Sequence, residues 1–265
     1  MYGAIIGDLA GSIYEFEQTK QVHPVIVDKI IEENSFYSDD TILTMAILDA
    51  ILNKEEVIYY EKYIKRYIQE YKNYKPNFQP YFKTAFSPNL IKWSEGKIEG
   101  RSKGNGAMMR TSPIGYLFNN EWDIIRQSTL ATYPSHYSYE AMDASQTIAL
   151  IIYYARSGMK KEEIIYRIAK SLKYQPFAKF NETCSETLPN CLYALFSSNS
   201  YEEAIKKVIS YGGDTDTNAC IVGAMAEALF GIDENLIFLA NQKLPTEFVN
   251  ILEEGYSRIK KIALY

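Results

Sequence analysis

The chain has 265 residues, of which 47% are hydrophobic and 23% are charged, as in ordinary globular proteins. Its formal net charge of -5 argues against duplex nucleic acid and membranes as main partners, because both favour a basic surface. No stretch approaches the roughly 18 apolar residues of a membrane-spanning helix, and the first residues lack the basic region of a signal peptide. We therefore expect a single cytoplasmic domain over residues 1–265, with its three cysteines as reduced thiols.

Near the start of the chain, three glycines at intervals of four residues predict one face of a closely packed helix. They are Gly3, Gly7 and Gly11. Asp8, within this helix, is either a buried carboxylate satisfied by hydrogen bonds or a support for a polar site. Glu15 follows about two turns later on the same expected helix, from where it would reach the same cavity.

Helical periodicity dominates the next part of the chain. Apolar residues at three- and four-residue spacing predict a helix over 42–51, preceded by Ser38, and an amphipathic surface helix over 55–71. The loop expected after it is indicated by three prolines, Pro76, Pro80 and Pro88. Residues 24–31 are the single candidate strand.

Helical patterns also fill the second half of the chain. The predicted helices cover 139–155, 160–172, 204–209 behind a capping pair (Ser200 and Glu203), and the segment after Pro245. Residues 217–230 are almost entirely small or apolar, which is typical of a buried helix, and Gly231 ends it. The fold class is therefore predicted to be all-α.

Two acidic segments lie where a loop enters an apolar helix. They are Ser38-Asp39-Asp40-Thr41 and Gly212-Gly213-Asp214-Thr215-Asp216-Thr217. N-capping accounts for one Asp or Ser at each helix start, but not for two close carboxylates at both. Like charges raise each other's pKa unless a positive charge lies among them. Because carboxylate and hydroxyl oxygens favour Mg²⁺ or Mn²⁺, whereas zinc favours Cys and His, we predict a site for a hard divalent cation.

A third polar segment, Ser102-Lys103-Gly104-Asn105-Gly106, has glycines on both sides of an asparagine. Such a loop exposes backbone N–H groups that suit phosphate oxygens, although a G-x-G alone is more typical of an ordinary loop. His136 precedes the predicted helix over 139–155, and the sequence leaves a structural role and a ligand contact equally open. His23 is expected at the surface.

Taken together, these segments resemble the ADP-ribosylglycohydrolase family. The matching motifs are GAIIGDLAG, SDDT, GNGAMMR, SHYSYEA and GGDTDT, in that order, over residues 3 to 231. The resemblance implies a compact orthogonal multi-helix bundle with a central metal cleft that holds two Mg²⁺ or Mn²⁺ ions. This chain departs from the family pattern at Met108, where a small residue is usual, and in a looser match around His136.

The resemblance also implies roles for individual residues. The metal ligands would be Ser38, Asp39, Asp40, Asp214, Asp216 and Thr217. The substrate-binding residues would be Ser102, Gly104, Asn105, Gly106 and His136. Glu15 matches a family glutamate near the metals, and Glu15, Asp40 and Asp216 are the candidate catalytic residues, with the identity of the general base left open.

The expected function is metal-dependent hydrolysis of the N- or O-glycosidic bond between ADP-ribose and a modified protein side chain or a small conjugate. One alternative is a catalytically silent ADP-ribose-binding protein or a crystallin-like relative, although that would be expected to have lost its aspartates. The other is a nucleotide-diphosphate phosphohydrolase, which the acidic segments alone would permit. The sequence does not indicate the leaving group.

Overall fold

The structure is a computed structural model that describes residues 1–54, 58–76 and 85–262. Its helices are α1 (Tyr2–Gly11), α2 (Glu15–Gln18), α3 (Asp39–Leu52), α4 (Tyr60–Tyr71), α5 (Pro88–Ser94), α6 (Gly106–Met109), α7 (Ser112–Leu117), α8 (Glu121–Thr132), α9 (Tyr139–Arg156), α10 (Lys161–Ile168), α11 (Cys184–Phe196), α12 (Tyr201–Ser210), α13 (Thr215–Phe230), α14 (Glu234–Lys243) and α15 (Thr246–Ile262). Within the described ranges there is no strand, only two isolated bridges, Arg101 with His136 and Gly104 with Thr183. The predicted all-α class is confirmed.

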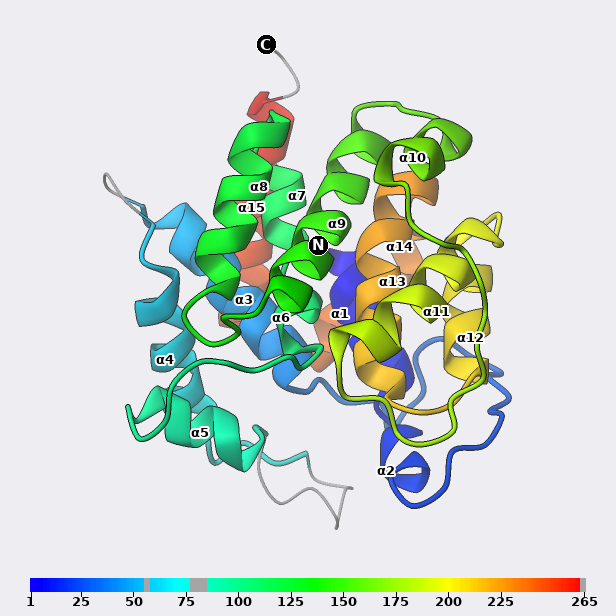
Figure 1. Cartoon of the computed structure of the whole chain (residues 1–265), viewed down its shortest axis with the longest axis horizontal. Helices are drawn as coiled ribbons and strands as arrows, with labels where there is room; N and C mark the ends of the chain where they lie inside the picture. Colours follow the sequence, from blue (N-terminus) through cyan, green and yellow to red (C-terminus); the bar gives the residue numbers. More distant parts are fainter. Residues whose placement is uncertain (55–57, 77–84, 263–265) are drawn as a thin grey trace.

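Helices α1 and α13 lie side by side in the interior of the bundle (Figure 1). Their backbones approach closely at the glycines of α1, which have no side chain to separate them. A methyl group added at Gly7 would lie 2.0 Å from the Ala219 carbonyl oxygen, and one added at Gly11 would lie 2.2 Å from that of Thr215. The predicted close packing of these glycines is therefore confirmed. Since the helices run in opposite directions, the end of α1 that carries Asp8 meets the first turn of α13.

Helix α3 brings the second acidic segment to the same place. Every residue from Asp40 to Leu52 is buried, so α3 is apolar on all sides and packs against α1, α13, α4, α7 and α15. A helix without a polar face has to lie inside the bundle. Its first turn therefore starts in the interior, beside the first turn of α13.

Several predicted boundaries hold. Helix α9 spans Tyr139–Arg156, and Ser138 caps it by accepting a hydrogen bond from the Ala141 N–H. Helix α13 is buried over most of its length and is followed by Gly231, as the small-residue pattern predicts. Pro245 stands directly before α15, and its carbonyl oxygen accepts from the Phe248 N–H.

Other predictions are wrong. Residues 24–31 form no strand, and the Val25 N–H donates to the Ser210 carbonyl oxygen of α12. Pro88 does not lie in a loop but opens α5, where the missing N–H of proline is tolerated. Helix α10 ends at Ile168, before residue 172, because Ala169 adopts a left-handed conformation with φ of 49°.

Two further predictions are only partly met. Ser200 accepts from the Glu203 N–H, but the Glu203 carboxylate accepts from Asn199 rather than from Ser200, so the capping box is incomplete. The helix expected over 55–71 begins at Tyr60, and residues 55–57, like Pro80 of the expected loop, lie outside the described residues.

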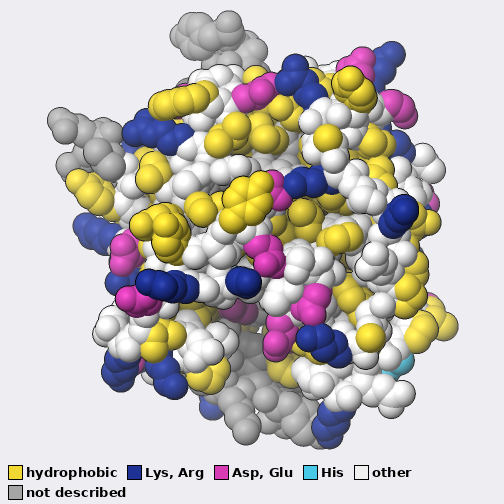
Figure 2. Space-filling model, viewed as in Figure 1, with side chains coloured by type: hydrophobic (Ala, Val, Ile, Leu, Met, Phe, Trp, Pro, Cys, Tyr) yellow, Lys and Arg dark blue, Asp and Glu magenta, His cyan; other side chains and the backbone are white. Residues whose placement is uncertain are grey.

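The surface carries charges of both signs. Figure 2 shows Lys and Arg side chains interspersed with Asp, Glu and hydrophobic side chains over the face that it draws. Among the described helices, none has the length and apolar character needed to cross a membrane.

Candidate metal and ligand site

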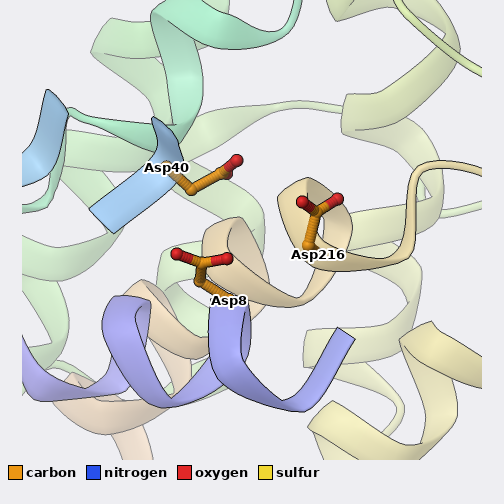
Figure 3. A group of neighbouring side chains, drawn as sticks. All are labelled: Asp8, Asp40 and Asp216. Atoms are coloured by element: carbon orange, nitrogen blue, oxygen red, sulfur yellow. The ribbon is translucent and has the colours of Figure 1, made fainter. Parts of the chain in front are cut away.

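Three aspartates from three helices converge in the interior. Asp8 of α1, Asp40 of α3 and Asp216 of α13 each place one carboxylate oxygen within 4.8 Å of the other two. Their side chains point toward a common space in Figure 3. All three are buried, with at most 3% of their surface exposed. Carboxylates in such proximity and burial require either protons or a cation.

A second group shares one member with the first. Glu15, Asp214 and Asp216 also place carboxylate oxygens within 4.8 Å of one another. Asp39 is half-buried and lines the same cavity. The two acidic segments of the sequence therefore meet across the first turns of α3 and α13, and Asp216 joins the two groups.

Glu15 reaches this site by a different route from the predicted one. Helix α1 ends at Gly11, where the Ser12 N–H and hydroxyl donate to the carbonyls of Asp8 and Leu9 and the Thr215 hydroxyl donates to the Gly11 carbonyl. The chain then turns, and Glu15 opens the separate helix α2. The expectation that Asp8 and Glu15 share one continuous helix is wrong, although both residues adjoin Asp216.

Asp8 has a role that the sequence left open. Its carboxylate accepts hydrogen bonds from the Ser38 N–H (2.9 Å), the Ser38 hydroxyl (2.8 Å) and the N–H and hydroxyl groups of Thr41. Two of these donors are backbone groups at the start of α3, so Asp8 binds the α3 N-terminus from a neighbouring helix. It is thus both a satisfied buried carboxylate and a support that orients α3 toward α13.

N-capping does not account for the other aspartates. At α3 the cap is Ser38, whose hydroxyl accepts from the Asp40 N–H. At α13 the N-cap residue Asp214 forms no capping hydrogen bond with its side chain. Three of the four aspartates, Asp39, Asp40 and Asp214, therefore have side chains free of a capping function.

Burial sets the electrostatics of the cluster. It raises the pKa of Asp8 to about 7, with the charge of Asp216 as the next cause, and the pKa of Asp214 to about 6. Burial followed by repulsion from neighbouring carboxylates also raises the pKa values of four further groups well above their usual range. These groups are Glu15, Asp39, Asp40 and Asp216. Without a cation, burial and mutual repulsion therefore favour the protonated form of these carboxyl groups.

The residues fit a hard divalent cation. Asp40 Oδ1 is buried and has no hydrogen-bond partner in the described part of the chain. The thiol of Cys220 lies beside Asp40 but donates to the Met109 carbonyl oxygen. An unpartnered carboxylate oxygen in the interior is costly unless something positive binds it. The converging atoms are all carboxylate oxygens, which are the ligands that Mg²⁺ and Mn²⁺ prefer.

The entry to α13 is held by two asparagines. Asn105 donates its amide N–H to Asp214 Oδ2 (2.7 Å), and Asn181 accepts from the Asp214 N–H (2.9 Å). Gly213 has φ of +77°, and a side chain there would lie 2.3 Å from Asn181 Oδ1, so only glycine suits the position. No sequence motif indicates Asn181, which lies in an irregular segment far along the chain from either acidic motif.

The cluster forms one wall of a cavity of about 870 Å³. Glu15, Asp39 and Asp216 line this wall, together with Ser38, Asp214 and Thr217. Asp40 lies behind it, in contact with Thr217, whose hydroxyl donates to Asp40 Oδ2 (3.1 Å). The cavity is also lined by the basic residues Arg101 and Lys103, by the aromatic residues Phe86 and Trp93, and by Glu99, which forms an ion pair with Arg101. A ligand there would meet the acidic cluster and, elsewhere in the lining, the positive charges of Lys103 and Arg110.

The loop over Ser102–Gly106 lines the cavity, but some of its backbone N–H groups already have acceptors within the protein. The Gly104 N–H donates to the Ser102 hydroxyl, and the Asn105 N–H donates to the Glu182 carbonyl. Gly106 opens α6, so its N–H has no acceptor within that helix. The start of α6 therefore offers a backbone donor to a ligand.

His136 lies against this loop. Its ring is 5% exposed and lines the cavity, and a methyl group added at Gly106 would lie 3.6 Å from His136 Nε2. Burial, followed by the positive charge of Arg110, lowers the pKa of His136 well below its usual value. His23 is exposed, as expected.

The chain is similar in sequence to several known proteins. The chain is 22% identical to "ADP-ribosylarginine hydrolase Tri1" of Pseudomonas putida (strain GB-1), over 88% of this chain and 70% of that protein. It is 26% identical to "Putative ADP-ribosyl glycohydrolase L543" of Acanthamoeba polyphaga mimivirus, over 86% and 84%. It is 22% identical to "ADP-ribosylhydrolase ARH3" of Mus musculus, over 88% and 83%.

The fold is similar to that of a solved structure, "ADP-ribosylglycohydrolase-related protein complex". The TM-score is 0.70 with 18% sequence identity, and the match covers 97% of this chain and 93% of the other. The family model described as ADP-ribosylglycohydrolase matches residues 1–264. The chain therefore belongs to the ADP-ribosylglycohydrolase family.

Proposed function

We propose that the protein hydrolyses the glycosidic bond between ADP-ribose and a modified protein side chain or a small conjugate, with the help of two Mg²⁺ or Mn²⁺ ions. The observation that carries the proposal is that Asp40 Oδ1 is buried without a hydrogen-bond partner in the described part of the chain, among converging carboxylates beside the cavity. The family to which the chain belongs supports the same activity. The similarity to an ADP-ribosylarginine hydrolase and to an ADP-ribosylhydrolase supports the same substrate class.

The residues that would hold the ions are those at the first turns of α3 and α13. They are Ser38, Asp39, Asp40, Asp214, Asp216 and Thr217. When bound, the ions would neutralise these carboxylates and polarise oxygen atoms of the substrate. Asp8 would act through Ser38 and Thr41, because it fixes the orientation of the α3 N-terminus.

Glu15 is suited to proton transfer. It is half-buried at the cavity wall, next to Asp214 and Asp216, and burial raises its pKa well above the usual value. A raised pKa increases the ability of a carboxyl group to hold and release a proton during the reaction, as a general acid or base requires. We assign to Glu15 the proton transfer with the reacting water. We assign to Asp40 and Asp216 the stabilisation of the positive charge that develops at the ribose.

Ligand positioning falls to the opposite side of the cavity. The loop with Ser102, Gly104, Asn105 and Gly106 would contact the diphosphate and ribose, with His136 beside it. Asn105 links the two walls because it also donates to Asp214. Correct placement of the ribose over the carboxylates is a large part of catalysis by orientation.

The proposal is tested with a panel of substrates that carry ADP-ribose on arginine, on serine, on acetate or on a second ADP-ribose. Each is incubated with Mg²⁺ or with a chelator, and the product is identified by mass. We expect at least one substrate to release intact ADP-ribose with Mg²⁺ and none with the chelator. Asp216→Asn should abolish release. The control variant Asp143→Asn changes a carboxylate of α9 that forms an ion pair with Lys170, and it should leave release intact.

Two outcomes would contradict the proposal. Release of AMP in place of intact ADP-ribose would identify a phosphohydrolase. Tight ADP-ribose binding without turnover of any substrate would identify a binding protein.

A further inference from the structure

Arg110 is a buried cation in the wall of the ligand cavity. Its side chain is 1% exposed, and it forms no ion pair with any carboxylate in the described ranges. Its Nε and Nη1 groups are buried without hydrogen-bond partners. Burial lowers the pKa of Arg110 to about 10, so the guanidinium remains charged at neutral pH. A buried charge without a counter-ion is expensive, and its retention here calls for a function.

The hydrogen bonds of Arg110 lead to His136. Arg110 Nη2 donates to the Ser135 hydroxyl (2.7 Å) and to the Ala131 carbonyl (3.2 Å). Ser135 Oγ in turn lies 2.7 Å from His136 Nδ1. Ser135 is 3% exposed, and all three residues of this hydrogen-bonded series line the cavity.

The direction of these bonds follows from the donors. A guanidinium has only donors, so the Ser135 oxygen accepts from Arg110. In the described part of the protein, the one acceptor within reach of the Ser135 hydroxyl proton is His136 Nδ1. If Nδ1 carried a proton instead, the serine proton would have no acceptor. The ring proton of His136 is therefore on Nε2, which faces the turn of Gly104 and Gly106.

We propose that Arg110 and Ser135 are positioning residues that hold His136 as the Nε2–H tautomer, so that the neutral ring donates a hydrogen bond to a diphosphate oxygen of the bound ligand. This inference rests on the proposed function of the cavity. Lys103 and Arg110 line the same cavity as His136 and form no ion pair among the described residues, so their positive charge favours an anionic group there.

The chain is well suited to a direct test, because His23 and His136 are its only two histidines. Nitrogen-15 NMR of histidine-labelled full-length protein distinguishes the two neutral tautomers and the charged form. His23→Gln assigns the two rings. We expect His136 to be neutral at neutral pH with its proton on Nε2. A proton on Nδ1, or a charged ring, would overturn the inference without touching the proposed hydrolysis.

A pair of serine variants tests the role in binding. Ser135→Ala removes the donor to Nδ1 and should release the ring into a mixture of tautomers. The Kd for ADP-ribose and the KM should rise about tenfold, with kcat nearly unchanged, as expected for one hydrogen bond to an anionic group. The matched control is Ser128→Ala, because the Ser128 hydroxyl is buried on α8 without a partner among the described residues. Its Kd should equal that of the wild type.

The outcomes separate the two levels of the proposal. If the wild type binds ADP-ribose and Ser135→Ala binds it equally well, the positioning role is overturned and the proposed function stands. If the wild type binds no ADP-ribose, the ligand role of His136 and the proposed function fall together, and the tautomer remains a measured property of the ring. If Ser135→Ala does not fold, the tautomer of the wild-type ring still decides the inference.

Discussion

Replacing Asp216 with asparagine should stabilise the metal-free protein while it destroys the metal site. Asp216 belongs to both carboxylate groups, and its neighbours lie within 4.8 Å of it. Two unit charges 4.8 Å apart repel by about 3.5 kcal/mol at an effective dielectric constant of about 20. The amide removes this repulsion, and its oxygen can still accept from the Thr217 N–H as Asp216 Oδ1 does.

The gain is smaller than the full repulsion because the wild-type cluster takes up protons. With the pKa of Asp8 at about 7, part of the charge is already neutralised at neutral pH. We expect a net stabilisation of about 2 kcal/mol in chelator, which is within the range seen when function-related strain is removed. For a chain of this size that corresponds to a rise in Tm of about 4–8 °C.

Divalent cations should make the wild type more stable than Asp216→Asn, the reverse of the order expected in chelator. Mg²⁺ at about 100 times its Kd adds about 2.7 kcal/mol to the wild type, whereas Asp216→Asn should gain almost nothing. Differential scanning fluorimetry measures the Tm of both proteins, each with chelator and with Mg²⁺. A lower Tm for Asp216→Asn in chelator, or an equal Mg²⁺-induced rise in both proteins, would refute the reasoning.

Three further predictions concern the same region. In chelator the free energy of unfolding should fall as pH rises from about 4 to about 7. The reason is that the pKa of Asp8 is about 7 in the folded protein and 3.8 in its ordinary state, so the folded protein binds the extra proton over this window. A Tm that rises over the same window would contradict the prediction. Gly7→Ala should lower the free energy of unfolding in urea by about 2–3 kcal/mol, since its methyl group would meet the Ala219 backbone. Gly255→Ala, whose methyl group would meet only side chains, should be near neutral in the same assay. Asn105→Ala should raise the Mg²⁺ Kd in calorimetry, because loss of its hydrogen bond raises the pKa of Asp214, and an unchanged Kd would exclude this link.

Local sequence signals predicted the features that depend on a single segment. The glycines of α1 and the small residues of α13 each describe a surface that permits close approach, and the two surfaces meet in the structure. The boundaries of α9 follow from its own N-cap and from the Gly158 turn, which has φ of +84°. Such elements are determined by residues a few positions apart.

Features that depend on distant partners were not predictable in this way. Asp8 accepts from residues 30 and 33 positions away, and nothing in its own helix indicates them. The end of α1 at Gly11 depends on a serine hydroxyl and on contact with Thr215, so periodicity alone extended the helix to Glu15. The connection from Arg110 through Ser135 to His136 likewise arises only when α6 packs beside the segment that precedes α9.

The most direct test of the proposed metal site is a crystal of the protein grown with Mn²⁺ and measured for anomalous scattering. We predict anomalous density bound by Asp40 and Asp216, with Asp40 Oδ1 among the ligands. The same crystal of Asp216→Asn should lose that density. Manganese found only at surface carboxylates, with none beside Asp40, would contradict the role assigned to the cluster.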